Sequence, residues 1–351
     1  MIIYSKSTGM VSAAIGQLEN PIKMIIEHES NLLSSQNGIC RQLFNIEKSS
    51  HYGESIVGYD DFGIFTHVAE GQNAESDTVG EFYHKFIEHI QFMKEFIVSA
   101  QMIEDSACGL AIDIKRRAAS FTRAYYKTIN KLCECALIGG TSTLTAFGNT
   151  YINTTAPDDL PLFANDHTVG DEDIQSNYYA GDLVKTGSGA SRQYSAETFA
   201  ESLAKLSIIY RNMKDECGEP LGYTADTIII PANRPELESI VRRACGSYGA
   251  IGTSNNDINL HYGAWNLVIL PSWQTNSDSI MIMSSEANKN LNGNMFFNRV
   301  PLTITNWVDN HSGNYVWNGR CRFGVGFGSY KHIMRIDDVE SGNIGSKRTA
   351  F

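Results

Sequence analysis

Several features of membrane, secreted and nucleic-acid-reading proteins are missing from this 351-residue sequence. No apolar run approaches the ~18–20 residues that a membrane-spanning helix needs. The N-terminus also lacks the basic, apolar and small-residue order of a signal sequence. Basic residues are in the minority, with 28 Lys and Arg against 39 Asp and Glu, which argues against dedicated recognition of DNA phosphates. These absences predict a soluble cytoplasmic product and leave open a weakly charged surface that faces DNA.

The cysteines form no recognisable framework. There are seven, an odd number, and none belongs to a Cys-x-x-Cys pair, so the sequence predicts neither a disulfide scaffold nor a zinc ribbon. Cys133 and Cys135 are two residues apart in a predicted helix and therefore point to different faces. We interpret all seven as reduced thiols of the core and surface.

Motifs for a cofactor, a metal or a catalytic centre are missing as well. The glycine-dense stretches 187–189 and 324–328 lack the residues and spacing of a nucleotide site, and in 324–328 glycine is expected to relieve side-chain crowding in a strand. Asp166 and His167, followed by acidic residues 171–173, are interpreted as solvated loop charges, because no second ligand cluster meets them. No cofactor, metal or enzymatic activity is therefore expected. A hydrolase that uses His167 with Asp166 stays open as an alternative.

The strongest pattern present is a long amphipathic helix from Gly109 to Ile138. Its apolar residues recur every three or four positions, the period of one helix face, and Gly139-Gly140 ends it. Taken alone, this pattern predicts only a helix in a domain core. The apolar face consists of Leu110, Ile114, Ala118, Phe121, Tyr125, Ile129, Leu132 and Ala136, and the polar face of Asp113, Arg116, Arg117, Arg123, Lys127, Asn130, Lys131 and Glu134.

The segment before this helix has no core of its own. Residues 54–70 have a β-like pattern, and residues 71–80 form a polar, Gly-rich tip. The apolar spacing of residues 82–98 is compatible with both a helix and a strand. Two limbs and a tip indicate a long hairpin, which is barely stable alone in water. Short helical patterns at 10–18 and 22–33 predict an N-terminal arm that is also marginal alone. We expect both parts to pack against a neighbour.

The rest of the chain predicts a mixed α/β module followed by strands. Residues 141–195 are rich in Thr, Asn, Asp, Gly and Ser, and predict long loops around the apolar element 160–163. Helices are expected at 196–213 and 235–244, buried strands at 227–231, 265–271 and 279–283, and tail strands at 302–307, 315–317 and 323–335.

The order of these elements resembles the major capsid proteins of tailed phages with the Hong Kong 97-like fold. The resemblance covers most of the chain beyond about residue 50 and rests on the joint order of residues 102–106, 160–167, 227–231 and 325–336. It implies an α+β fold with four parts. These are an N-terminal arm (1–50), an extended β-hairpin loop (51–98), a peripheral domain with its sheet, a loop insertion and the spine helix 109–138 (99–195 and 287–351), and an α/β axial domain (196–286).

The resemblance also implies a function. The chain is expected to be the major capsid (head) protein of a tailed bacteriophage or prophage, a non-enzymatic virion protein whose pentamers and hexamers form an icosahedral shell around double-stranded DNA. Assembly in the bacterial host cytoplasm, without a membrane, would involve a portal protein, a separate scaffolding protein and DNA held on the inner face without sequence specificity, and a decoration protein stays open as a further partner. An encapsulin-like nanocompartment shell with protein cargo stays open as an alternative. Inter-subunit contacts are expected at Phe62, Phe65, Gly71, Gly80, Phe82, Phe86, Arg116, Arg117 and Arg123.

Overall fold

The structure is a computed structural model in which two compact units are recognised from their internal contacts. Unit 1 comprises Met1–Glu54, Ile87–Cys133 and Phe296–Val325, and unit 2 comprises Ser55–Phe86, Glu134–Met295 and Gly326–Phe351. The helix predicted at 10–18 lies outside the described residues. Those residues are 3–4, 24–33, 38–59, 65, 67–73, 76, 81–99, 101, 110–169, 173–246, 259, 261–340 and 343–351.

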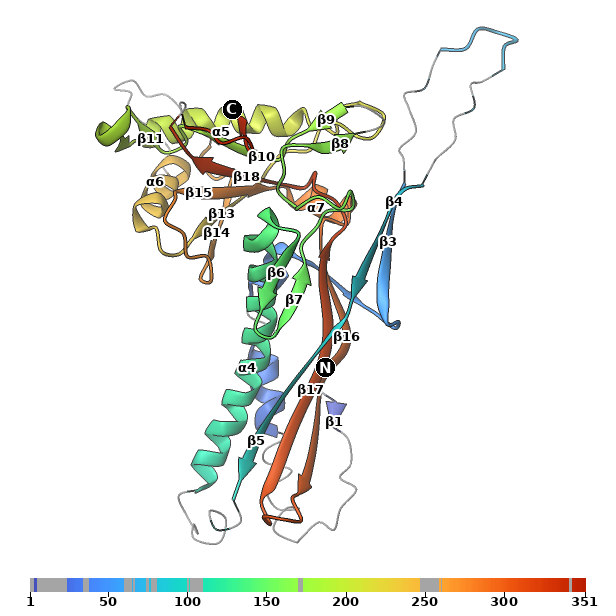
Figure 1. The fold of residues 1–351 in the computed structure, drawn as a ribbon, viewed down its shortest axis with the longest axis vertical. Coiled ribbons are helices and arrows are strands. Elements are labelled where there is room, and N and C mark those ends of the chain that lie inside the picture. The colour runs from blue at the N-terminus through green and yellow to red at the C-terminus, as the bar shows by residue number, and fades with distance from the viewer. Residues whose placement is uncertain are drawn as a thin grey trace. The chain divides into compact units, whose positions relative to one another are not determined.

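Unit 1 contains a sheet of order β1-β16-β17-β5, with β2 also paired to β16. β17 and β5 are antiparallel from Tyr315↔Val98 to Phe323↔Ile90, and β1 runs parallel to β16 (Figure 1). The strands are β1 (Ile3–Tyr4), β2 (Asn45–Lys48), β5 (Ile90–Val98), β16 (Asn294–Val308) and β17 (Tyr315–Phe327), and β16 and β17 continue into unit 2.

The undecided segment 82–98 is strand throughout. β4 (Glu81–Glu88) and β5 are separated only by His89. Nine consecutive residue pairings with β17 fix β5 in this state, because pairing and side-chain packing against a sheet neighbour override a helical spacing of apolar residues. The apolar residues of 82–98 that recur every three or four positions therefore do not form a helix face.

The long helix is confirmed as α4 (Leu110–Ile138), and it ends in a 3-10 turn at Gly139–Thr141. Four residues of its predicted apolar face are buried: Ala118, Phe121, Leu132 and Ala136. In unit 1 this face packs against Leu302, Ile304 and Trp317 of the sheet, and against Ile26 of the helical residues 24–33. Gly319 lies directly under Phe121, since a Cβ there would be 2.3 Å from the ring Cζ.

One residue of the predicted polar face is placed differently. Glu134 is 4% exposed, and its Oε2 accepts a hydrogen bond from the backbone N–H of Ser272 at 2.8 Å, within unit 2. Cys133 and Leu137 beside it are also buried. The last two turns of α4 are therefore enclosed on more than one side, which a single-face pattern could not predict.

Unit 2 is built on a six-stranded sheet of order β14-β13-β15-β18-β10-β19. Its core contains Phe199, Leu206, Ile228, Val241 and Ile280, all less than 2% exposed. The predicted strands 227–231 and 279–283 are found as β13 (Thr227–Pro231) and β15 (Ser279–Met283), and the predicted helices as α5 (Ala196–Arg211) and α6 (Pro235–Gly246). The other elements are β10 (Tyr178–Gly181), β14 (Asn266–Leu270), α7 (Ser285–Asn290), β18 (Ile333–Asp338) and β19 (Thr349–Ala350).

Residues 141–195 are not the long loops that their composition predicts. They form short hairpins whose strands of two to four residues are too short to show a period. The tail strand predicted at 323–335 is also divided, because residues 328–332 turn between β17 and β18. The hairpin strands are β6 (Leu144–Phe147), β7 (Thr150–Asn153), β8 (His167–Val169), β9 (Asp173–Gln175), β11 (Lys185–Thr186) and β12 (Gln193–Tyr194).

Candidate subunit-contact residues and polar clusters

The predicted hairpin is present as the two-stranded sheet of β3 (Gly53–Tyr59) and β4. Tyr83 anchors its root within unit 2. The Tyr83 hydroxyl donates a hydrogen bond to Gly328 O at 3.1 Å, and burial raises its pKa to about 12. Its ring lies against Gly58, where a Cβ would be 2.1 Å from the ring carbon Cζ. Only glycine fits beneath this ring.

Lys85 is the second anchor and points the same way as Tyr83, two residues along the strand. It is 4% exposed, and its ammonium donates to Thr155 Oγ1 and to Asn153 Oδ1 at 3.4 Å. Burial lowers the pKa of Lys85, while Asp159 and Asp158 oppose that shift. A lysine held by neutral oxygens alone fixes the root of the hairpin without a direct ion pair.

Three predicted contact residues of the hairpin are exposed to solvent. Phe86 is 49% exposed and Phe65 is 99% exposed, and Gly71 occupies an exposed turn with φ +85°. Of the other predicted contact residues here, Phe62 and Gly80 lie outside the described residues, and for Phe82 only the backbone is described.

The three predicted arginines all lie on the exposed side of α4. Arg117 Nη1 donates to Ile97 O at 3.0 Å, and Arg123 Nη2 is 3.2 Å from Glu29 Oε1. Arg116 forms no hydrogen bond or ion pair with another described residue. Two of the three therefore have a partner within the same chain.

Sequence reasoning missed two further exposed apolar residues, on β5. Met93 is 57% exposed and Ile97 is 45% exposed, and β5 is the edge strand of its sheet. Strand alternation, once β5 is known to be a strand, would have placed them on the face away from Phe92 and Phe96. An edge strand with uncovered apolar side chains is a surface on which another chain can pack.

His167 is not a solvated loop charge. It is fully buried, its ring is stacked on Tyr330 at 3.9 Å, and Nδ1 is 2.6 Å from Asp158 Oδ2. Nε2 faces Leu162 O at 3.2 Å. Asp166 is exposed and is not the partner of this histidine. The dyad of the hydrolase alternative is therefore not formed, and His167 fastens β8 to the turn that carries Asp158.

A polar cavity of about 320 Å³ lies beside this turn in unit 2. Its lining includes Asp158, Asp159, Glu216 and Lys331. Lys331 Nζ and Glu216 Oε1 form an ion pair at 2.5 Å. Across the described part of the chain, no three His, Cys, Asp or Glu side chains are grouped so that they could hold a metal ion. Of the four charged side chains named in the cavity lining, Glu216 and Lys331 therefore neutralise each other.

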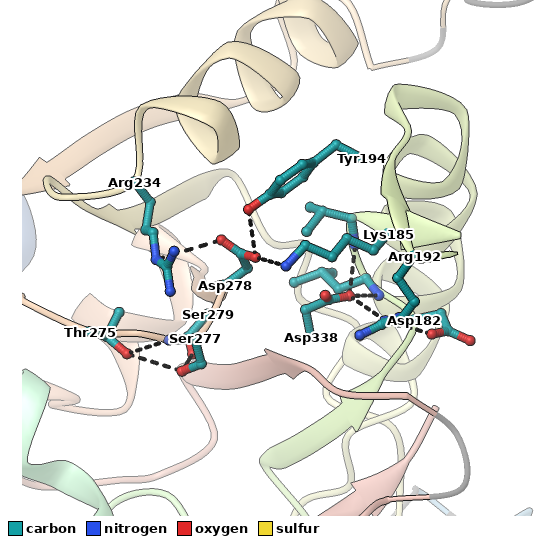
Figure 2. A network of polar contacts seen from close by, with 12 residues as sticks. Asp182, Lys185, Arg192, Tyr194, Arg234, Thr275, Ser277, Asp278, Ser279 and Asp338 are labelled. Carbon is teal, nitrogen blue, oxygen red and sulfur yellow. Dashed lines mark hydrogen bonds and ion pairs between the residues drawn. The ribbon is translucent and has the colours of Figure 1, made fainter. Parts of the chain in front are cut away.

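A charged network fastens the β11–β12 hairpin to the sheet of unit 2 (Figure 2). Lys185 Nζ and the Tyr194 hydroxyl both reach Asp278 Oδ2, at 2.5 and 2.9 Å. Arg192 Nη2 lies 3.1 Å from Asp338 Oδ1, which also accepts two backbone N–H groups. Burial raises the pKa of Asp338, and these donors oppose the shift. The side chains of both aspartates are 1% exposed, so the hairpin neutralises two buried carboxylates.

Comparison with known proteins identifies the fold. No protein-family model matches the sequence, and no curated protein matches it. The structure is similar to the capsid of Myoviridae phage XM1, with a TM-score of 0.51 and 13% identity over 86% of this chain and 92% of that chain. It is equally similar to the capsid of a native GTA particle, with a TM-score of 0.51 and 13% identity over 86% and 90%. The chain therefore has the α+β fold of phage capsid subunits, which confirms the predicted resemblance at the level of the fold.

Within the described residues, no helix is long and apolar enough to cross a membrane.

Proposed function

We propose that this chain is the major capsid protein of a tailed phage or prophage. Copies would assemble as pentamers and hexamers into a closed icosahedral shell that encloses double-stranded DNA in the virion. Assembly would take place in the host cytoplasm with a portal protein and a separate scaffolding protein, and a decoration protein stays open as a further partner. The chain would act as a structural protein without catalysis.

The observation that carries this proposal is the exposure of two phenylalanines on a hairpin whose root is held by hydrogen bonds. Phe65 is 99% and Phe86 49% exposed, while Tyr83 and Lys85 are bonded into unit 2. Fully covering Phe65 would contribute about 1.5–3 kcal/mol, and covering the half-exposed Phe86 about half as much. A shell repeats the same contact in every subunit, and closed assemblies of this kind use heterologous contacts whose rotation closes.

The similarity to capsid folds over most of the chain supports the assignment of residue ranges to capsid parts that the resemblance implies. In this proposal residues 1–50 are the arm and 51–98 the extended loop that lies on a neighbouring subunit. Residues 99–195 and 287–351 are the peripheral domain. Residues 196–286 are the axial domain around the five- and six-fold axes.

Sizing of the purified full-length protein tests the proposal directly. We expect megadalton shells or capsomer rings by analytical ultracentrifugation and electron microscopy, whereas a stable monomer or dimer under assembly conditions would contradict it. Nuclease-protected duplex DNA inside particles from host cells supports the phage role, and a protein cargo would instead indicate a nanocompartment.

Two matched variants locate the contact. Phe65→Glu places a charge on the fully exposed ring position and should abolish assembly, whereas Phe65→Leu keeps an apolar side chain and should retain it. Both variants should unfold at the temperature of the parent chain, because Phe65 has almost no cover within its own subunit. If both variants assemble equally well, Phe65 of the hairpin does not lie in the subunit interface.

A further inference from the structure

The two units differ sharply in charge. The chain as a whole carries 28 basic and 39 acidic residues, but unit 1 holds 14 of the basic and only 11 of the acidic ones. Its formal net charge is therefore +3 and that of unit 2 is −14. Charge asymmetry of this size between parts of one chain is typical of proteins that contact nucleic acid.

The positive charge of unit 1 is concentrated on one helix. Between Arg116 and Lys131, α4 has five basic residues and no acidic one. All five are exposed: Arg116, Arg117, Arg123, Lys127 and Lys131. At about 100° and 1.5 Å per residue, they cover roughly a third of the helix circumference over about 22 Å. We call these five residues the basic stripe.

Most of the basic stripe is free to bind a ligand. Arg116, Lys127 and Lys131 form no ion pair with another described residue, and the guanidinium of Arg117 donates only to the carbonyl oxygen of Ile97. Arg123 is the exception, since it pairs with Glu29. The opposite face of α4 is packed in the core of unit 1, so the helix presents the stripe from a fixed support.

We infer that the basic stripe is the surface on which this protein binds the phosphate backbone of double-stranded DNA. This inference rests on the proposed function, because it assigns the contact with enclosed DNA to a named helix face. The stripe consists of long cationic side chains, without exposed Asn, Gln or aromatic side chains at its centre to read or stack on bases. Binding is therefore independent of sequence, and four unpaired cations contact phosphates.

The acidic surface of a second copy fits the stripe less well. The buried centre of a protein–protein contact is depleted in lysine and enriched in aromatic residues, Met and Arg. Between positions 116 and 131 the exposed side of α4 has no large exposed apolar side chain, and two of its five cations are lysines. Apolar side chains suited to subunit contact lie elsewhere, on β4 and β5. DNA phosphate, a polymer with one charge per about 1.7 Å of helix axis, matches the stripe better.

Fluorescence anisotropy with a 30-base-pair labelled duplex tests the inference on the unassembled full-length chain. Four phosphate contacts predict a slope of log K against log salt of about −3.6, hence a fall in affinity of about 150-fold between 50 and 200 mM salt. Lys127→Ala/Lys131→Ala should weaken binding at least tenfold at 50 mM and halve the slope. Lys205→Ala/Arg211→Ala is the matched control. It removes the same charge from exposed positions of α5 in unit 2 and should bind like the parent.

Three outcomes would overturn the inference. The first is that the parent chain does not bind the duplex, and the second is that the stripe and control variants lose equal affinity for it. The third is that the affinities for two duplexes of unrelated sequence differ by more than about threefold. If the stripe variant binds DNA normally but no longer forms capsomers, the stripe is a subunit contact instead. Assembly is scored separately by sizing: a parent that forms shells without binding DNA refutes only this inference, and one that binds DNA without assembling refutes only the proposed function.

Discussion

Replacing Lys185 with methionine should destabilise unit 2 far more than the loss of an ordinary surface ion pair. Lys185 Nζ is 2.5 Å from Asp278 Oδ2, and the two side chains are 25% and 1% exposed. In Lys185→Met the partners of the buried carboxylate that remain among the described residues are the Tyr194 hydroxyl at 2.9 Å and Arg234 Nε at 3.8 Å. Breaking one half of a buried pair costs about 3–5 kcal/mol. The quarter exposure of Lys185 and the remaining partners reduce this to about 2–3 kcal/mol.

Urea unfolding followed by tryptophan fluorescence measures this loss, because Trp265 and Trp273 both lie in unit 2. With an m-value on the order of 3 kcal/mol/M, a loss of about 2.5 kcal/mol lowers the midpoint by roughly 0.8 M. The control Glu238→Gln breaks the exposed pair with Arg242, whose side chain is 61% exposed, and should cost no more than about 0.5 kcal/mol.

A second variant separates the buried charge from simple loss of packing. Lys185→Met/Asp278→Leu removes both charges, and apolar replacements of a buried pair are often neutral or stabilising. The double variant should therefore be more stable than Lys185→Met alone. A cost below about 1 kcal/mol for the single variant, or further destabilisation on adding Asp278→Leu, would show that the Lys185–Asp278 pair in Figure 2 is not a buried charge pair that stabilises unit 2.

Three further substitutions test the fold. Gly319→Ala drives a Cβ to 2.3 Å from Phe121 Cζ and should lower the unfolding free energy by about 1–3 kcal/mol, whereas Gly345→Ala, with no atom within 4 Å of the new Cβ, should leave the urea midpoint unchanged. Burial lowers the pKa of His332 to about 3, so the unfolded chain binds one more proton between pH 6.5 and 3, and stability falls by about 1.4 kcal/mol for each unit by which the pH is lowered in that range. His332→Asn should remove that slope in unfolding measured from pH 7 to 4, and an unaltered slope would contradict it. Glu134→Ala removes the acceptor of the partly buried Ser272 N–H and should cost about 1–2 kcal/mol by thermal unfolding; a change below about 0.5 kcal/mol would show that this hydrogen bond is unimportant.

The sequence predicted elements whose signals are local. β13 and β15 are short apolar runs buried on both faces, and α4 is a 29-residue helix with one dominant apolar face. Such patterns are set by the chain's own period and by its stop signals. By contrast, the state of 82–98 depends on β17, more than 200 residues away in the sequence. No local pattern could have decided it.

The site residues divide in the same way. Exposure of Phe65 and Phe86 was expected because the hairpin has no core of its own, and both are exposed in the isolated chain. His167 was misjudged because its partners come from elsewhere: Asp158 from the preceding turn and Tyr330 from the turn after β17. A polar loop composition says nothing about a distant aromatic ring that covers one of its residues.

The proposed subunit contact and the proposed DNA contact should respond oppositely to salt, which makes them separable in one preparation. Phe65 and Phe86 are apolar, and burying such side chains does not depend on ion pairs. The basic stripe acts through charge, and at 1 M salt the Debye length is only about 3 Å. Shells transferred to 1 M NaCl should therefore persist by sizing, whereas binding of the duplex to the unassembled chain should disappear. Shells that dissociate in parallel with the loss of DNA binding would mean that charged contacts, the stripe among them, hold the subunits together.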